Sequence, residues 1–472
     1  MTSHQYLALD LGAESGRAIL ADLSGGLLKL QEVHRFANIP VTLPTGMYWN
    51  TTGLFQEMLE GIRAAARITG RLDSVAIDTW GVDFGLLGPD GALIDNPRHY
   101  RDTRTAGIPD EVYAITPPAE IFARTGIQFM DINSLYQLYA VHQRAPWLLK
   151  TARTLLFMPD LFNYFLCGVH AAERTIASTS QFYDPANCRF ATELFDKLGI
   201  PSGILADLVD PGIRLGELLP AVASFCGLAA GTPVYTTASH DTASAVAAVP
   251  ASTEKGWCYI SSGTWSLMGM ELERPLMNEA ALEANFTNEV GVGSIRFLKN
   301  IPGLWLLQEC RRAWAKEGAE YSYDELIAMA REAKPLDTVL HLDAFLSAGQ
   351  NAGKIREHCE ATGQAAPQDV GSVCRVILYS LAVRYREVLA TLERLTGQNI
   401  EVIHIVGGGS RNRLLNQLTT NVTGRRVVAG PSEATAAGNA LVQSLGAGHL
   451  ASLDELRCVV RRSFPVEEFL PS

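Results

Sequence analysis

The sequence lacks the features of a membrane, secreted or nucleic-acid-binding protein. No stretch of about 18 apolar residues is free of charge, and the longest candidate, VCRVILYSLAVRY, contains Arg375 and Arg384, so we expect no membrane span. The N-terminus has no basic segment followed by an apolar one, which argues against a signal peptide and predicts a cytoplasmic protein. A formal net charge of -11 argues against a nucleic-acid partner.

Paired cysteine motifs are missing as well. The eight cysteines are scattered and none forms a C-x-x-C pair, so the usual spacing of a zinc site is absent. We interpret them as reduced thiols of a cytosolic protein. Cys359 and Cys374 are the only pair close enough in sequence to suggest a local disulfide, and that question stays open at this point.

The residues that are present predict a two-domain α/β enzyme. A chain of 472 residues exceeds one ordinary core, and 47% hydrophobic with 19% charged residues is typical of a globular enzyme. In the last third, an apolar run at helical spacing ends at Gly397, residues 400–406 read as a buried strand, and further helices and strands alternate. We place the domain boundary near residue 250, giving domains 1–250 and 251–472.

Two distant segments read alike. Residues 6–23, YLALDLGAESGRAILADL, and residues 257–272, WCYISSGTWSLMGMEL, are each an apolar strand, a turn of small residues and a second strand. The backbone N–H groups of such a turn can bind a phosphate. Glu14 lies in the first turn, where its carboxylate would repel a phosphate, so either this is no phosphate loop or Glu14 has another role.

Other short segments allow a catalytic and a structural interpretation. In SHDTASAV, Asp241 could take a proton from a substrate hydroxyl, or it could simply cap a helix. In DTWGVDF, Trp80 could stack on a sugar while Asp78 or Asp83 accepts its hydroxyls, or Gly81 could mark a bend with both acids facing water. Each segment alone leaves both interpretations open.

The glycine-rich segment GGGSRN, residues 407–412, is equally ambiguous. It resembles a dinucleotide fingerprint but has Asn412 where the third glycine belongs, so that motif fails. Glycines would let a flat ligand approach the backbone, and the following helix N-terminus would favour phosphate. A tight strand-to-helix turn explains the same residues.

Taken together and in chain order, these segments resemble the FGGY family of sugar kinases. The resemblance spans essentially the whole chain, and the ordered series is far more specific than any single motif. It is carried by DLGAESGR, AIDTWGVDFGLL, YRDTRT, GIQF, ASHDTASAV, SSGTWSLMG, LKNIPGLWLLQ, IVGGGSRNRLLNQL and AGPSEATAAGN.

The resemblance implies an actin-like fold, in which two ribonuclease H-like domains face each other across a cleft and ATP lies between the two hairpin turns. It is strongest to the branch that phosphorylates L-rhamnulose at its 1-hydroxyl in L-rhamnose catabolism, with ATP as co-substrate and Mg²⁺ as cofactor. A kinase for a related ketose such as L-fuculose, and a non-catalytic actin-like module that binds sugar and ATP, are the alternatives. Monomer and homodimer both remain open.

The resemblance also implies roles for individual residues. Asp241 matches the catalytic base, and Asp10 matches the aspartate that holds magnesium through water. The predicted sugar-binding residues, from the resemblance and from DTWGVDF, are Trp80, Gly81, Asp83, His240, Asp241, Thr242 and Asn300. The predicted ATP-binding residues are Ala13, Glu14, Ser15, Gly16, Arg17, Thr264, Gln308, Gly408, Gly409 and Asn412.

Glu14 is the departure from the family pattern. The family normally has a hydroxyl residue at this position, and a hydroxyl can donate to a phosphate oxygen whereas a carboxylate cannot. We expect the Glu14 carboxylate to turn toward a magnesium-bound water or out of the cleft, while the backbone N–H groups of the loop bind the phosphate.

Overall fold

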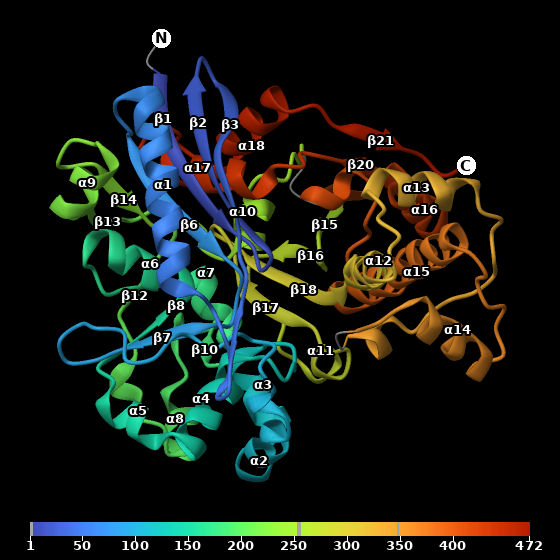
Figure 1. Cartoon of the computed structure of the whole chain (residues 1–472), viewed down its shortest axis with the longest axis horizontal. Coiled ribbons are helices and arrows are strands. Elements are labelled where there is room, and N and C mark those ends of the chain that lie inside the picture. Colours follow the sequence, from blue (N-terminus) through green and yellow to red (C-terminus); the bar gives the residue numbers. More distant parts are fainter. Residues whose placement is uncertain (1–2, 253–255, 347–348) are drawn as a thin grey trace. The chain divides into compact units, whose positions relative to one another are not determined.

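The computed structural model describes residues 3–252, 256–346 and 349–472, which form two compact units (Figure 1). We predicted a single boundary near residue 250 that divides the chain into two consecutive domains. In the structure, two segments beyond that boundary pack with the N-terminal residues. The first unit comprises Met1–Ala248, Glu271–Phe297 and Ala434–Ser463, and the second comprises Val249–Met270, Leu298–Glu433 and Phe464–Ser472.

The first unit is organised around a mixed sheet with the strand order β13-β14-β6-β1-β2-β3. β2 is antiparallel to β1 and to β3, whereas β6 is parallel to β1 and to β14. The hairpin of β1 and β2 confirms the strand-turn-strand prediction for residues 6–23. The strands are β1 (Ser3–Leu11), β2 (Ser15–Ser24), β3 (Leu27–Ala37), β6 (Ser74–Thr79), β13 (Arg214–Glu217) and β14 (Pro233–Tyr235).

Helices cover this sheet and extend the unit. The helices that pack near the sheet are α1 (Thr51–Thr69), α6 (Met158–Cys167), α9 (Pro220–Cys226), α10 (Asp241–Ala247), α17 (Ala434–Gly446) and α18 (Leu453–Ser463). The others are α2 (Ile108–Ile115), α3 (Pro118–Thr125), α4 (Ser134–Arg144), α5 (Pro146–Thr151), α7 (Arg174–Ala177), α8 (Thr192–Leu198) and α11 (Glu279–Glu283). Small strand pairs accompany them: β4 (Val41–Leu43) with β5 (Gly46–Tyr48), β7 (Phe84–Leu87) with β8 (Thr154–Phe157), β9 (Ala172–Glu173) with β12 (Leu208–Val209), and β10 (Tyr183–Asp184) with β11 (Arg189–Phe190).

Side-chain alternation along β1 decides which helix covers which face of the sheet. Leu7, Leu9 and Leu11 point to one face and join a core that includes buried side chains of α1. Ala8 points to the other face and packs with Ala436 of α17. Ala8 and Ala436 have small side chains, so α17 can approach β1 closely at this point.

The second unit contains the strands β16-β15-β19-β20-β21, in that order, of a second sheet. The predicted helix that ends at Gly397 is confirmed as α15, where Gly397 adopts the left-handed conformation with φ 68°. The strands are β15 (Trp257–Ser262), β16 (Trp265–Leu272), β19 (Val402–Val406), β20 (Arg426–Ala429) and β21 (Glu467–Phe469). Between β16 and β19 along the chain, β17 (Thr287–Val290) belongs to the first unit, and β18 (Ile295–Pro302) has its first three residues in the first unit and the rest in the second. The helices are α12 (Trp305–Lys316), α13 (Tyr323–Glu332), α14 (Ala352–Ala361), α15 (Val370–Thr396) and α16 (Arg413–Thr423).

The internal repeat expected from the sequence is present in the strand pairing. In the first unit, the β1–β2 hairpin has β6 parallel to its first strand. In the second unit, the β15–β16 hairpin has β19 parallel to its first strand. The two turns that were predicted to bind phosphate therefore occupy equivalent places in the two units.

Two further expectations concern cysteines and membranes. All eight cysteines are free, so Cys359 and Cys374 do not form a disulfide in this structure. Among the described residues, no helix is both long enough and apolar enough to cross a membrane.

Gly438 of α17 yields a first test, because it is in van der Waals contact with α10. A Cβ added at Gly438 would lie 1.8 Å from the carbonyl oxygen of Ser244, which is main chain and cannot rotate away. Overpacking costs about 1–3 kcal/mol or more, which exceeds the gain of about 1 kcal/mol from replacing a mid-helix glycine. We expect Gly438→Ala to lower the free energy of unfolding, measured by urea denaturation.

The matched control is Gly203→Ala, whose added Cβ would meet no heavy atom within 4 Å. It should leave the unfolding free energy nearly unchanged. Wild-type stability in Gly438→Ala would show that α10 and α17 can separate without cost.

Candidate active site

The turn between β1 and β2 is fixed by Asn38, which sequence reasoning missed. The Asn38 side chain donates from Nδ2 to the carbonyl oxygen of Gly12 at 2.9 Å, and its backbone N–H donates to that of Glu14 at 3.0 Å. Gly16 lies against Phe36, since an added Cβ would be 2.2 Å from that ring. Glu14 is exposed on a turn whose main chain is held by its neighbours. The other predicted residues here, Ala13, Ser15 and Arg17, are half-buried.

Three carboxylates gather where β1 and β6 end and α10 begins. Asp10 lies opposite Asp78 in the parallel register of β1 and β6. Burial, and then the charges of Asp10 and Asp241, raise the pKa of Asp78 well above its usual value. Asp78 accepts from Asn439 Nδ2 at 2.6 Å through Oδ2, whereas its buried Oδ1 has no hydrogen-bond partner among the described residues.

Asp10 is partly neutralised by Arg17, the residue opposite it in the β1–β2 hairpin. The Arg17 Nη2 lies 2.5 Å from Asp10 Oδ2, and both side chains are mostly buried. The predicted magnesium-holding carboxylate and the predicted phosphate-binding arginine are therefore in contact.

Asp241 is the first residue of α10, and His240 occupies the N-cap position without a side-chain capping bond. The capping interpretation of Asp241 is therefore not the arrangement in the structure. Its Oδ1 accepts from the backbone N–H of Thr242 at 2.5 Å and from the Thr242 hydroxyl at 3.1 Å. Removal from bulk water and the charge of Asp10 raise the pKa of Asp241, although the side chain remains 31% exposed. A partly accessible carboxylate of raised pKa is suited to take up a proton.

The main chain before Asp241 is held by Glu173, another residue that the sequence did not mark. The buried Glu173 carboxylate accepts from the backbone N–H of Ser239 at 3.1 Å and from the Thr175 hydroxyl at 2.5 Å. The same hydroxyl oxygen accepts from the backbone N–H of His240 at 3.1 Å. Burial raises the pKa of Glu173 to about 7, against the lowering effect of these hydrogen bonds.

Asp83 is a fully enclosed acceptor rather than an acid facing water. Its Oδ2 accepts from the indoles of Trp49 and Trp80 at 2.6 and 3.0 Å and from the backbone N–H of Tyr100 at 3.2 Å. Its Oδ1 accepts from Gln137 Nε2 at 2.9 Å. Burial raises the pKa of Asp83 to about 6. The carboxylate thus orients Trp80, and its predicted contact with a sugar stays a prediction.

The neighbouring Val82 has a strained backbone. Its φ of 69° lies in the left-handed region, which is unusual for a β-branched residue and costs about 1–3 kcal/mol. The Thr179 hydroxyl accepts from the Val82 N–H at 3.0 Å, and Ser134 donates to the Val82 carbonyl at 2.5 Å. An added Cβ at Gly81 would lie 3.1 Å from Thr179, so the peptide at Gly81 is closely confined.

In the second unit, two predicted ATP residues contact each other. The Gln308 side chain donates from Nε2 to the Thr264 hydroxyl at 3.1 Å. The backbone N–H groups of Gly303 and Trp305 both donate to the Thr264 carbonyl, at 3.1 and 3.2 Å. The turn after β15 is therefore fixed by the start of α12, as the β1–β2 turn is fixed by Asn38.

The three glycines after β19 differ in whether the local structure requires a glycine. Gly407 has a φ of 81°, and an added Cβ at Gly409 would lie 2.0 Å from the Ser262 hydroxyl, so both are required by the turn. Gly408 is exposed, and an added Cβ would meet nothing within 4 Å. Asn412 caps α16 by accepting from the backbone N–H of Leu415. The tight-turn interpretation therefore explains Gly407, Gly409 and Asn412, but it gives no reason for the glycine at position 408.

The predicted residues thus fall into two local sets. The first unit contains the acids, the first turn and the 239–242 loop, and the second contains Thr264 with Gln308 and the glycines beside Ser262. Asn300, the remaining predicted sugar residue, is half-buried in the part of β18 that belongs to the second unit.

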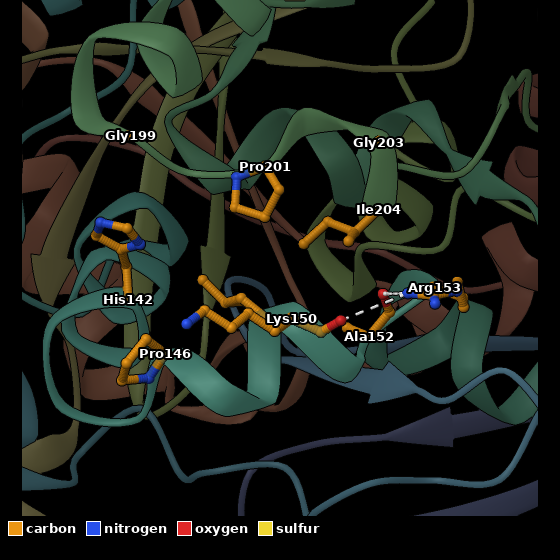
Figure 2. Close-up of a pocket in the computed structure, with 10 residues that line it drawn as sticks. His142, Pro146, Lys150, Ala152, Arg153, Gly199, Pro201, Gly203 and Ile204 are labelled. Carbon is orange, nitrogen blue, oxygen red and sulfur yellow. Dashed lines mark hydrogen bonds between the residues drawn. The ribbon is translucent and has the colours of Figure 1, made fainter.

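A separate cavity of about 440 Å³ lies in the helical part of the first unit (Figure 2). Its lining includes three basic side chains, His142 of α4, Lys150 of α5 and Arg153, which precedes β8. Arg153 Nη1 donates to the carbonyl oxygens of Lys150 and Ala152 at 3.5 and 3.2 Å. None of the described residues that line this cavity is a predicted site residue, so the cavity is distinct from the candidate active site.

Comparison with known proteins connects these features. The N-terminal domain of the FGGY family of carbohydrate kinases matches residues 5–248, and the C-terminal domain matches residues 258–447. Rhamnulokinase from Bacteroides thetaiotaomicron is 42% identical over 99% of this chain and 96% of its own. Rhamnulokinase from Bacillus subtilis is 38% identical over 99% of this chain and 95% of its own.

Solved structures agree on the fold. Ligand-bound xylulose kinase from Lactobacillus acidophilus superposes with a TM-score of 0.82 at 14% identity, covering 99% of this chain and 94% of its own. Plasmodium falciparum glycerol kinase with ADP gives a TM-score of 0.80 at 15% identity, with the same coverage. The fold is the predicted actin-like sugar kinase fold. With both domains matched over nearly its whole length, the chain belongs to the FGGY family of carbohydrate kinases.

Proposed function

We propose that this kinase transfers the γ-phosphoryl group of ATP to the 1-hydroxyl of L-rhamnulose, forming L-rhamnulose 1-phosphate and ADP in L-rhamnose catabolism. The observation that carries the proposal is the identity of 42% and 38% to two rhamnulokinases over nearly the full length of each chain. We place the enzyme in the cytoplasm, where ATP is supplied and where eight free thiols stay reduced.

In this mechanism Asp241 is the catalytic base. It takes the proton from the sugar hydroxyl as that oxygen attacks the γ-phosphorus, so that no alkoxide has to form beforehand. The raised pKa of Asp241 makes its carboxylate a stronger proton acceptor than an ordinary aspartate. The two hydrogen bonds from Thr242 to Oδ1 set the orientation of the carboxylate.

The sugar is bound by the segments that flank Asp241. We propose contacts from His240, Thr242 and the backbone of Gly81, with Trp80 covering an apolar side of the sugar. Asp83 contributes by fixing the Trp80 indole through a hydrogen bond of 3.0 Å. Asn300 contributes a further hydrogen bond from the second domain.

ATP is bound by both hairpin turns in this proposal. The backbone N–H groups of Ala13, Glu14, Ser15 and Gly16, with Arg17, contact phosphate oxygens, as does Thr264. Gln308 supports Thr264 through its hydrogen bond of 3.1 Å. The open surface at Gly408 lets the nucleotide lie close to the backbone, beside Gly409 and Asn412.

Mg²⁺ bound to ATP fits the charge of the site. Asp10, Asp78 and Asp241 bring three carboxyl groups together, which a cation would stabilise in the ionised form, and the buried Asp78 Oδ1 has no hydrogen-bond partner in the described part of the chain. Within the described ranges no three His, Cys, Asp or Glu side chains are grouped to hold an ion, and we propose that Asp10 contacts the magnesium through water. When bound, the ion neutralises charge that develops on the transferred phosphoryl group.

Asp241→Asn tests the base. Asparagine keeps the size of the side chain but cannot accept the hydroxyl proton, so kcat should fall by about 100- to 10,000-fold. ADP binding, measured by calorimetry, should stay largely intact, and Asp110→Asn on the exposed face of α2 serves as the control. Undiminished turnover in Asp241→Asn would remove this residue from the mechanism.

Because a base must be deprotonated, its raised pKa also has a consequence for pH. The acid limb of the kcat/KM profile should lie above the pH expected for an ordinary aspartate, and activity should fall as the pH drops through that pKa.

Glu14→Ser tests the first phosphate turn. A carboxylate 4 Å from a bare phosphate charge costs about 4 kcal/mol at an effective dielectric of about 20, so the exposed side chain should face magnesium-bound water instead. The variant should then require more Mg²⁺ for half-maximal activity. An unchanged ATP KM and an unchanged magnesium dependence would make Glu14 a bystander.

A panel of ketoses with ATP tests the substrate. L-Rhamnulose should give the highest kcat/KM, because the relatives on which the proposal rests are rhamnulokinases that match nearly the whole chain. Equal values for L-fuculose and L-rhamnulose would refute the specific assignment. Phosphorylation of no ketose at all would favour the non-catalytic sugar- and ATP-binding alternative.

A further inference from the structure

The imidazole of His240 contacts a buried ion pair that comes from a distant part of the chain. Arg296 of β18 is fully buried, and its Nη2 lies 3.0 Å from Glu289 Oε2 of β17, whose side chain is 5% exposed. The same Nη2 lies 3.0 Å from His240 Nδ1, and Glu289 Oε2 lies 3.2 Å from that nitrogen. All three residues belong to the first unit.

The other side of the ring faces the catalytic base. His240 Nε2 lies 3.5 Å from Asp241 Oδ1, and the His240 side chain is only 9% exposed. The ring therefore lies between the ion pair at Nδ1 and the proposed base at Nε2.

Burying this ion pair costs folding free energy, so its presence beside His240 requires an explanation. Replacing a buried ion pair by well-packed apolar side chains is often neutral or stabilising, so the pair is weak evidence for a role in stability. Arg296 Nη1 is also buried and has no hydrogen-bond partner among the residues described, which adds to the cost. Arg296 is held in place by Glu289 and by a hydrogen bond of 3.1 Å from its Nε to the Val290 carbonyl.

The charges at the pair decide which atom of His240 carries the proton. Burial alone would raise the pKa of Glu289, but the charge of Arg296, with the contacts to His240 and Arg296, lowers that pKa overall, so Glu289 is an ionised acceptor. An Arg Nη2 can only donate, so its 3.0 Å hydrogen bond to His240 Nδ1 requires that nitrogen to accept, whereas the 3.2 Å contact of Nδ1 with Glu289 Oε2 would require it to donate. We take the shorter contact as the hydrogen bond. With Nδ1 accepting, the single proton of the neutral ring lies on Nε2.

We infer that Arg296, oriented by Glu289, is a positioning residue for phosphoryl transfer: it fixes the neutral Nε2–H form of His240, so that this ring donates a hydrogen bond toward Asp241 and the sugar hydroxyl. His240 is then a fixed donor and not a second base. The inference rests on the proposed function only in taking Asp241 as the base.

The attachment of β17 within the first unit supports this role. The Val290 N–H donates to the Ser178 hydroxyl at 2.9 Å, and the Asn288 side chain donates to the Gly126 carbonyl at 3.0 Å. These bonds tie the strand that carries Glu289 to two earlier segments of the same unit. The position of the Glu289–Arg296 ion pair is therefore fixed by contacts other than those with His240.

The first measurement is the protonation of the His240 ring in the unaltered protein. With ¹⁵N-labelled histidine, the ring signals that disappear in His240→Gln belong to His240. We expect a protonated Nε2 and an unprotonated Nδ1 at neutral pH. A protonated Nδ1, in either a neutral or a charged ring, would overturn the inference, and this result does not depend on the identity of the substrate.

The second measurement is kinetic and uses the double variant Glu289→Leu/Arg296→Met. Removing both charges together leaves no unpaired buried charge, so the protein should fold with a Tm near that of the wild type. Loss of a fixed donor should lower kcat by about 10- to 100-fold while the sugar KM changes less than about threefold. A folded double variant with wild-type kcat would show that the pair is only structural. If it does not fold, the ring measurement decides.

A matched control is available in the same unit. Arg457 Nη2 lies 2.6 Å from Glu271 Oε2, and their side chains are 10% and 14% exposed. Arg457 also approaches the carbonyl of Val246 in α10, at 3.4 Å, but this is the end of the helix opposite His240. Glu271→Leu/Arg457→Met should therefore keep wild-type kcat. If both double variants lose activity equally, the effect is general destabilisation and the positioning role is refuted.

Discussion

The parallel pairing of β1 with β6 is the constraint on which the candidate site depends. It places Asp10 beside Asp78, at the carboxyl ends of neighbouring strands. The pairing continues beyond β6, because the Thr79 N–H donates to the Ser239 carbonyl at 2.9 Å and Thr79 forms a parallel bridge with His240. Asp241 therefore comes to the same edge of the sheet as the other two acids. Ligands of α/β proteins bind at such edges.

Bringing carboxylates together has a cost that the surrounding residues determine. Where both oxygens accept hydrogen bonds from the chain itself, as at Asp83, the acid organises its neighbours and has little capacity left for a ligand. Asp241 is different, because both of its recorded hydrogen bonds go to one oxygen and the side chain is 31% exposed. The distribution of donors separates the acids that position other groups from the acid that can exchange a proton.

The second unit repeats the hairpin and its parallel partner but not the charges. If the two turns are aligned on Gly12 and Gly263, Asp10 corresponds to Ser261. The residue opposite Ser261 on β19 is Val406, whereas the residue opposite Asp10 on β6 is Asp78. The same local geometry can present backbone N–H groups in both units, but only the first unit has a concentration of carboxyl groups at these positions. A base is needed once, and the structure contains one such concentration among these equivalent positions.

Local pattern in the sequence was enough for the hairpins, the α15 helix with its Gly397 cap and the family resemblance, because each depends on neighbouring residues or on short motifs. Local sequence pattern could not predict contacts between residues that are distant in the chain. Nothing near Asn38 marked it as the residue that fixes the first turn, and nothing near Glu289 and Arg296 linked them to His240, about 50 residues earlier in the chain. The capping and bend interpretations of Asp241 and Asp83 were also decided only by the folded chain. Whether an acid faces water or a buried donor depends on which strands and helices pack around it, and only the tertiary structure determines that.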